Sequence, residues 1–120
     1  MDINIDGRRF VWDDEKARIN FQKHGIQFKT AIKVFRDEYK LVQLDYLHSE
    51  YEERWQVIGM VNDVLFVIYT ERGKSTRVIS ARKATVQERM RYYVNRDLLF
   101  AERCDADSGR GSGNCGSEGF

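Results

Sequence analysis

Residues 55–73 read WQVIGMVNDVLFVIYTERG, two apolar runs separated by a polar pair. β-Branched and aromatic residues dominate both runs, a composition typical of strands that pack in a sheet. Asn62 and Asp63 between the runs favour a two-residue hairpin turn. This stretch therefore predicts two adjacent antiparallel strands over residues 55–61 and 64–70, at the centre of a sheet.

Further strands are expected on both sides of this hairpin. Residues 77–82 (RVISAR) indicate a short, largely buried strand after a turn at Gly73, and residues 39–46 indicate another strand before the hairpin. Near the N-terminus, residues 10–12 (FVW) form a third apolar run of strand character. The sheet is therefore expected to collect strands from most of the chain.

Three helices complete the predicted fold. Acidic residues 13–15 suit the first turn of a helix, and Gly25 suits its end. Residues 28–35 carry apolar side chains at i, i+3, i+4 and i+7, which indicates a second helix. Thr85 and Glu88 match a capping box that opens a C-terminal helix. The expected order is β-α-α-β-β-β-β-α, a small α+β domain with an antiparallel sheet, two N-terminal helices and one C-terminal helix.

The 120 residues suit one domain. Five of the nine glycines and both cysteines lie after Phe100, in a stretch with little apolar content. We therefore expect a folded domain over residues 1–97 and a disordered, Gly/Ser-rich tail over residues 98–120. No apolar run approaches the roughly 20 residues that span a bilayer, and the N-terminus lacks a secretion signal, so the sequence predicts a cytoplasmic protein without a membrane partner.

The net charge of +1 conceals an uneven distribution. Residues 37–53 hold six acidic side chains and one basic one, whereas residues 71–96 hold eight basic side chains and two acidic ones. A basic segment of this length is a candidate for binding phosphates, although such runs are often only solvated surface. The overall charge balance therefore does not exclude a nucleic-acid substrate.

The side-chain inventory restricts the chemistry. Residues 1–97 contain no cysteine, the two histidines are not paired, and no phosphate-binding loop or dinucleotide fingerprint occurs. Arginine, lysine, tyrosine and glutamate remain, and these suit cleavage of RNA by its own 2′-hydroxyl, which requires a proton acceptor, a proton donor and cations around the phosphate. The sequence therefore predicts no metal and no cofactor.

Several short motifs occur in an order that resembles one family. They are FVWDDEKARINFQKHGIQF (10–28), Val34-Phe35 with Asp37, HSEYEERWQVIG (48–59), LFVIYTERG (65–73) and RVISARKAT (77–85) followed by QER. In this order they resemble the BrnT family of type II toxins, from Phe10 to about Tyr93. The chain departs from many relatives at Glu38 and at Tyr51-Glu52, where those relatives carry Pro and Gly, so the acidic loop is a point of difference.

The resemblance implies a fold, an activity and a partner. BrnT proteins look like RelE-type ribonucleases, so the chain is expected to be a RelE-like, metal-independent endoribonuclease that cleaves mRNA, leaves a 2′,3′-cyclic phosphate and inhibits translation and growth. Its partner would be a BrnA-like antitoxin of ribbon-helix-helix type. The complex would bind operator DNA through the antitoxin.

Candidate site residues follow from the motifs and from the basic segment. Arg77 and Arg82 are five residues apart, so they are expected on opposite sheet faces, one lining a groove and the other anchoring the C-terminal helix or ending the strand. His24 could be an acid or base or a helix cap, and Arg72 could be only a turn charge. Tyr93 could stack on a base or pack in the core. The predicted catalytic residues are Arg54, Arg72, Arg82, His24 and Glu53, and the predicted substrate-binding residues are Lys23, Arg77, Lys83 and Tyr93.

A second hypothesis needs the same basic surface. The chain could be a decayed toxin, a non-catalytic module that binds RNA or the antitoxin and acts as a transcriptional corepressor. Binding alone requires no acid or base, so the residue pattern does not separate this hypothesis from the enzyme.

Overall fold

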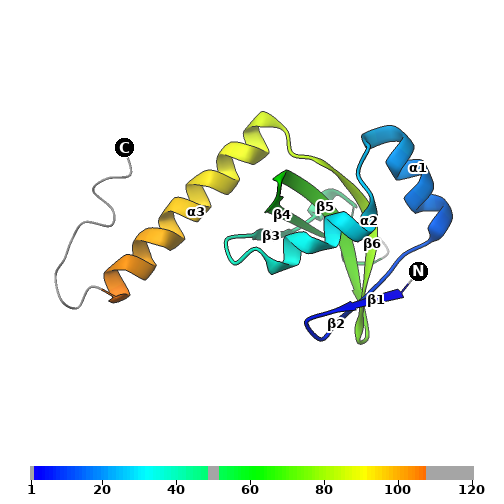
Figure 1. Ribbon diagram of the computed structural model, residues 1–120, viewed down its shortest axis with the longest axis horizontal. Coiled ribbons are helices and arrows are strands. Elements are labelled where there is room, and N and C mark those ends of the chain that lie inside the picture. Colours follow the sequence, from blue (N-terminus) through cyan, green and yellow to red (C-terminus); the bar gives the residue numbers. More distant parts are fainter. Residues whose placement is uncertain (1, 49–51, 108–120) are drawn as a thin grey trace.

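The computed structural model describes residues 2–48 and 52–107, and within them a single six-stranded sheet in the order β1-β2-β6-β5-β4-β3 (Figure 1). The predicted α+β class is confirmed. The strands are β1 (Asp2–Ile5), β2 (Arg8–Val11), β3 (Leu41–Leu44), β4 (Trp55–Val61), β5 (Asp63–Arg72) and β6 (Ser75–Lys83). The helices are α1 (Asp14–His24), α2 (Phe28–Ala31) and α3 (Val86–Asp107), with 3-10 turns η1 (Ile32–Arg36) and η2 (Tyr46–His48).

The predicted central hairpin is confirmed. Strands β4 and β5 pair antiparallel from Trp55 opposite Tyr69 to Val61 opposite Asp63. The turn is tighter than predicted, because β5 already begins at Asp63 and Asn62 alone lies between the strands, with a positive φ of 63°. Asparagine tolerates this left-handed conformation better than most residues, which explains why the turn needs no glycine.

The N-terminal edge of the sheet differs from the prediction. Strand β1 was not expected, and it pairs antiparallel with β2 through a turn in which Asp6 and Gly7 both have positive φ. Strand β2 then pairs with β6 in parallel, with Phe10 opposite Thr76. The sheet is therefore mixed at this one pair rather than antiparallel throughout.

The first predicted helix is confirmed in detail. The Asp13 carboxylate accepts hydrogen bonds from the backbone N–H groups of Glu15 and Lys16, at 2.9 and 3.1 Å. These two backbone bonds and the positive charges of Lys16 and Arg77 hold the pKa of Asp13 below its usual range. Gly25 ends the helix with φ of 71°, as its lack of a side chain allows.

The second predicted helix is only partly α-helical. Residues 28–31 form one α-turn, and the 3-10 turn η1 follows it. The tighter winding buries Val34 completely and leaves Phe35 partly exposed, the reverse of the predicted pattern. Val34 then packs so closely on Gly59 of β4 that a Cβ at Gly59 would lie 2.9 Å from the Val34 Cβ.

Apolar side chains pack on both faces of the sheet, in two separate clusters. Helix α1, α2 and η1 pack on one face around buried Phe10, Val57 and Val67. Helix α3 packs on the other face through Tyr92, which contacts a cluster that includes Ile58. Successive residues of β4 and β5 therefore alternate between two cores.

Helix α3 is longer than expected. It begins at the predicted capping box, in which the Glu88 N–H donates to the Thr85 hydroxyl and the Thr85 N–H donates to the Glu88 carboxylate. It continues to Asp107 and extends away from the sheet (Figure 1). The predicted domain boundary at residue 97 thus falls inside the helix, and the remainder of the predicted tail, residues 108–120, lies outside the described residues.

Candidate nucleic-acid interface

One face of the sheet is only partly covered. Helix α3 covers the end of this face that carries Ile58 and Phe66. Two residues away from Ile58 and Phe66 along β4 and β5, the side chains of this face are half-buried, and they are polar or small except for Ile68. We call this surface the open face and define it by the cross-strand row Gln43, Gln56, Ile68 and Ser80.

A β-bulge brings two predicted arginines to this face. Across β5 and β6, Arg82 lies opposite Phe66, Ser80 opposite Ile68 and Arg77 opposite Thr70, while the register shifts between Ile68 and Tyr69. The extra residue in β6 reverses the alternation, so Arg77 and Arg82 share one face. The expectation that they point to opposite faces is wrong, because it assumed an unbroken strand.

Two more arginines lie along the open face. Arg72 ends β5, two residues after Thr70, and its Nη2 atom lies 3.0 Å from Glu52 Oε2 in an exposed ion pair. Arg54 directly precedes β4 and, by strand alternation, shares the side of Gln56. The Thr70 hydroxyl donates to the Glu53 carbonyl at 2.8 Å, which holds the 52–54 segment against the sheet.

Arg77 is the least engaged of these arginines. It is half-buried, and within residues 2–48 and 52–107 it has no ion pair within 4.0 Å. Its guanidinium is close enough to Asp13 to help lower the pKa of that carboxyl. The structure therefore gathers Arg54, Arg72 and Arg77 with the backbone of Glu53 at one end of the open face.

Arg82 occupies the other end and has a different environment. Its guanidinium donates to both carboxylate oxygens of Glu88, at 2.8 and 2.9 Å, and lies 4.1 Å from the centroid of the Phe66 ring. Burial raises the pKa of Glu88, but the Arg82 hydrogen bonds and the Thr85 N–H outweigh it, so the net shift is downward. Arg82 thus ties β6 to the first turn of α3, the anchoring role that sequence left open for one of the two arginines.

The remaining predicted residues are not assembled with these arginines. Lys23 and His24 are exposed at the end of α1, which packs through Ala17 on the opposite face. Lys83 lies opposite Leu65 of that same face, with its Nζ 3.8 Å from Asp63. Tyr93 is half-buried between the Tyr92 ring, at 5.4 Å, and the Arg96 guanidinium, at 4.7 Å.

Sequence reasoning missed a polar chain across the open face. Arg91 of α3 donates to the Gln43 side-chain oxygen, and Gln43 Nε2 donates to Gln56 Oε1 at 2.5 Å. The available signal was that Gln43 and Gln56 interrupt apolar strands at positions in step with Leu41 and Ile58. Recognising it requires the register of β3 on β4, which the sequence does not supply.

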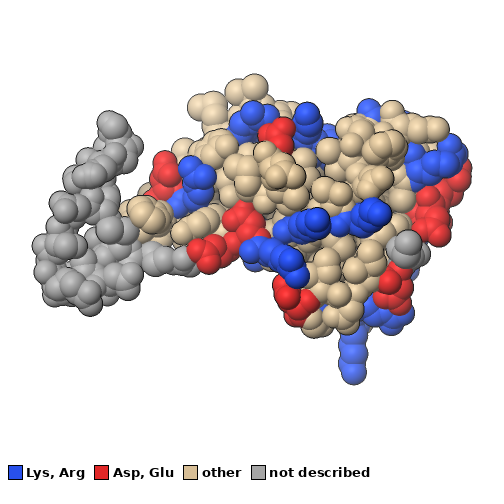
Figure 2. Space-filling view, viewed as in Figure 1, with Lys and Arg blue, Asp and Glu red and all other residues tan. Residues whose placement is uncertain are grey.

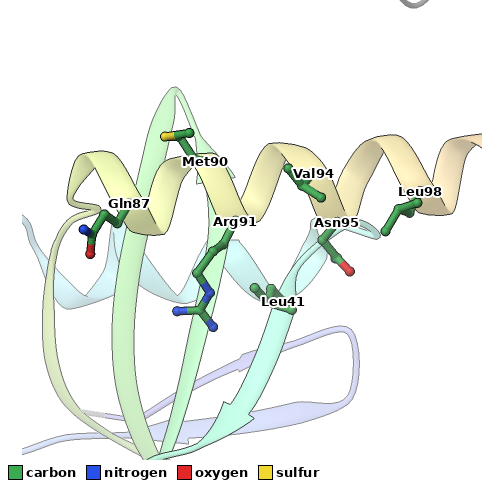
Figure 3. A pocket seen from close by; sticks show the side chains of 7 residues that line it. All are labelled: Leu41, Gln87, Met90, Arg91, Val94, Asn95 and Leu98. Carbon is green, nitrogen blue, oxygen red and sulfur yellow. The ribbon is translucent and has the colours of Figure 1, made fainter.

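A groove of about 670 Å³ runs between α3 and β3. Figure 3 shows Arg91 extending from α3 toward the strands, beside Leu41 of β3. Arg91 is the one charged residue among those that line the groove. The exposed apolar residues of α3 that border it are Met90, Val94 and Leu98.

Two smaller pockets lie outside the open face, one of about 320 Å³ beside Trp12 and Phe28 and one of about 160 Å³ beside Phe10 and Phe35. Acidic and basic side chains are interspersed over the face seen in Figure 2. Across the described part of the chain, no cluster of three or more His, Cys, Asp or Glu side chains could hold a metal ion. No helix in those same ranges is long and apolar enough to cross a membrane.

Comparisons with known proteins identify the family. The family model for the ribonuclease toxin BrnT of type II toxin–antitoxin systems matches residues 12–88. The crystal structure of the Brucella abortus ribonuclease toxin BrnT is similar, with 26% sequence identity and a TM-score of 0.50, over 63% of this chain and 95% of that one. No curated protein sequence matches. The chain therefore belongs to the BrnT family of ribonuclease toxins of type II toxin–antitoxin systems.

Proposed function

We propose that the chain is a metal-independent endoribonuclease that acts in the cytoplasm. It binds the scissile phosphate at the end of the open face where Arg54, Arg72 and Arg77 lie. The observation that carries this proposal is the convergence of Arg54, Arg72 and Arg77 on one side of the sheet, with Arg77 free of an ion pair among the described residues. Guanidinium groups match phosphate oxygens in geometry and stay charged at any working pH.

The reaction needs little more than charge and proton transfer. The ribose 2′-oxygen attacks the phosphorus, its proton passes to a base, and the bond to the 5′-oxygen breaks as that oxygen takes a proton from an acid. The products are a 2′,3′-cyclic phosphate and a 5′-hydroxyl. The arginines stabilise the charge on the pentacoordinate phosphate. Glu53 is the candidate base; its carboxylate is exposed and adjoins Arg54 in the chain, and it would have to turn from the side of Trp55 to reach the phosphate.

The ion pair between Arg72 and Glu52 fits substrate exchange. Both side chains are exposed, by 51% and 36%, so their attraction is screened and weak. A phosphate carries a full charge and several acceptor oxygens, and it can replace Glu52 as the partner of Arg72 at little cost. Glu52 thus shields the cation when no RNA is bound.

The proposal is tested by induced expression in bacteria, with growth recorded and RNA ends sequenced. Wild type is expected to stop growth and to produce fragments with 5′-hydroxyl and cyclic phosphate ends. Arg72→Ala and Arg77→Ala are each expected to reduce cleavage about 10²-fold, the usual loss for one transition-state donor. Arg18→Ala is the matched control for Arg72, because Arg18 is an equally exposed arginine paired with Glu15 on α1.

The result that overturns the enzyme is wild-type protein that leaves growth and RNA intact. In that case the chain is a non-catalytic corepressor, and it would still bind RNA or an antitoxin through the same surface. Cleavage that survives in both arginine variants would instead show that the phosphate lies elsewhere.

The partner that fits this chain is a BrnA-like antitoxin of ribbon-helix-helix type, which neutralises the toxin and carries the operator DNA contacts. Its acidic segments are expected along residues 72–96, where the cations gather, and the apolar row beside the α3 groove suits a protein partner. Co-expression with the product of the adjacent gene should restore growth, and the complex should shift operator DNA that the chain alone does not bind. A complex whose affinity does not change with salt concentration would contradict the charged interface.

A further inference from the structure

We propose that Gln56 reads a nucleobase next to the cleaved phosphate, with its amide held in one orientation by Arg91 and Gln43. Because this inference rests on the proposed ribonuclease site, it concerns which RNA positions are cut. The ligand it assigns is a base with an exocyclic oxygen, guanine at C6 or uracil at C4, in preference to adenine or cytosine, which carry amino groups there.

The orientation of Gln56 follows from the nature of Arg91. A guanidinium can only donate hydrogen bonds, so the Arg91 contact fixes the Gln43 side-chain oxygen toward α3. The Gln43 NH2 group must then face β4, where it meets Gln56 Oε1 at 2.5 Å. The oxygen and nitrogen of an isolated amide can be exchanged by a flip, but here the Arg91 guanidinium at one end of the hydrogen-bonded row Arg91–Gln43–Gln56 removes that ambiguity.

The outcome is a directed donor on the open face. With its oxygen engaged by Gln43, Gln56 presents its NH2 group away from β3, and that group has no partner among the described residues. Gln56 is half-buried and lies opposite half-buried Ile68, which offers an apolar surface beside the donor. These two groups suit a nucleobase, because the Gln56 NH2 group can donate to the edge of the base while Ile68 packs against its face.

The spacing from the arginines fits one nucleotide. Arg54 is two residues from Gln56 along the chain, and Arg77 lies opposite Thr70, two residues from Ile68. Two residues of a strand span about 6.6 Å, comparable to the separation of phosphate and base within a nucleotide. A phosphate on the arginines therefore places its base over Gln56 and Ile68. Single-stranded RNA can present the Watson–Crick edge of such a base.

The discriminating variant is Gln56→Glu. A carboxylate still accepts the hydrogen bond from Gln43, so the geometry persists, but the outer atom changes from a donor to an acceptor. The base preference at this position should therefore reverse, from guanine and uracil in wild type to adenine and cytosine in the variant. One neutral hydrogen bond predicts a preference of about fivefold to tenfold in either direction.

The experiment maps cleavage ends in total RNA from cells that express wild type, Gln56→Glu, Arg91→Met and, as a control, Gln22→Glu. Gln22 is exposed on α1, so its substitution makes the same charge change away from the open face. The control should keep the wild-type preference. Arg91→Met should reduce the preference for guanine and uracil over adenine and cytosine, because the amides of Gln43 and Gln56 can then adopt either orientation.

The outcomes separate the two proposals. Absence of cleavage by wild type removes the ribonuclease proposal itself. Cleavage by wild type with unchanged base frequencies in both Gln56→Glu and Arg91→Met overturns the base-reading inference and leaves the ribonuclease standing. Should Gln56→Glu fail to fold, Arg91→Met decides alone, since Arg91 is exposed on α3.

Discussion

The assignment of Arg82 to anchoring gives a sharp prediction about stability. Its guanidinium donates to both oxygens of Glu88 and covers the Phe66 ring. The two charged side chains are 33% and 16% exposed, so solvent screens the pair only in part. Replacing Glu88 by Gln removes the negative charge and one hydrogen-bond acceptor of the ion pair. Replacing Arg82 by Gln removes the positive charge and the donors of the same ion pair.

The magnitude follows from these contacts. A hydrogen bond to a charged group contributes about 1.5–3 kcal/mol, which the partial exposure of Arg82 reduces to about 1–2 kcal/mol for the pair. Arg82→Gln should cost slightly more than Glu88→Gln, because it also removes the contact with Phe66, worth about 0.5–1 kcal/mol. Each kcal/mol lowers the Tm of a domain of this size by about 4–8 °C.

The measurement is urea unfolding of both single variants and the double variant. Because the same interaction is removed in each single variant, the double variant should be about 1–2 kcal/mol more stable than additivity predicts. Cleavage activity of Arg82→Gln, assayed well below its Tm, should stay within about tenfold of wild type. The reasoning is refuted if Arg82→Gln keeps full stability yet abolishes cleavage, since Arg82 would then be a catalytic residue.

The pH dependence of this pair has a defined sign. The folded-state pKa of Glu88 is lowered, so its contribution is complete above the unfolded value of about 4.3 and is lost as pH falls through the lower folded value. Wild type should therefore lose more stability in acid than Glu88→Gln does. Equal acid sensitivity of the two proteins would contradict the assignment.

Three further substitutions test the packing. Gly59→Ala should cost about 1–3 kcal/mol in urea unfolding, because the new Cβ would lie 2.9 Å from the Cβ of fully buried Val34; a neutral result would contradict that contact. Asn20→Leu should cost about 2–4 kcal/mol, since the buried Asn20 amide bonds the N–H and C=O of one β6 residue; retention of wild-type stability would show that water satisfies both groups. Tyr92→Phe should cost about 1 kcal/mol in urea unfolding, because it removes the hydrogen bond from the buried Tyr92 hydroxyl to Asp37; unchanged stability would contradict a stabilising role for this bond.

The fold was largely predictable because its signals are local. The apolar runs of β4 and β5, the carboxylate at the start of α1 and the capping box of α3 each occur within a few residues, and each is confirmed. Strand β1 was missed because it has only four residues, with polar and apolar side chains alternating and no apolar run. Its partner β2 shows why the parallel pair was missed as well, since pairing with distant β6 leaves no local trace.

The site was less predictable because it depends on register. The residue types were identified, but one extra residue in β6 decides whether Arg77 and Arg82 share a face. Nothing in RVISAR marks a bulge, since Ile79 and Ser80 suit a regular strand equally well. Register also gives the two arginines different environments, because it places Arg82 opposite Phe66 and within reach of Glu88, whereas Arg77 lies opposite Thr70, at the end of this face that α3 does not cover.

The same argument explains why the glutamine row escaped notice and why it matters. A polar residue inside an apolar strand can simply be exposed to solvent or can belong to a functional site, and both cases have the same sequence pattern. Strand pairing sets Gln43 directly opposite Gln56, and α3 brings Arg91 over them from 48 residues away along the chain. The direction of each hydrogen bond then follows from one fixed donor. The orientation of the Gln56 amide at the open face thus depends on β3, β4 and α3 together. A substitution at Arg91, on a helix outside the arginine cluster, is therefore expected to alter which bases are accepted.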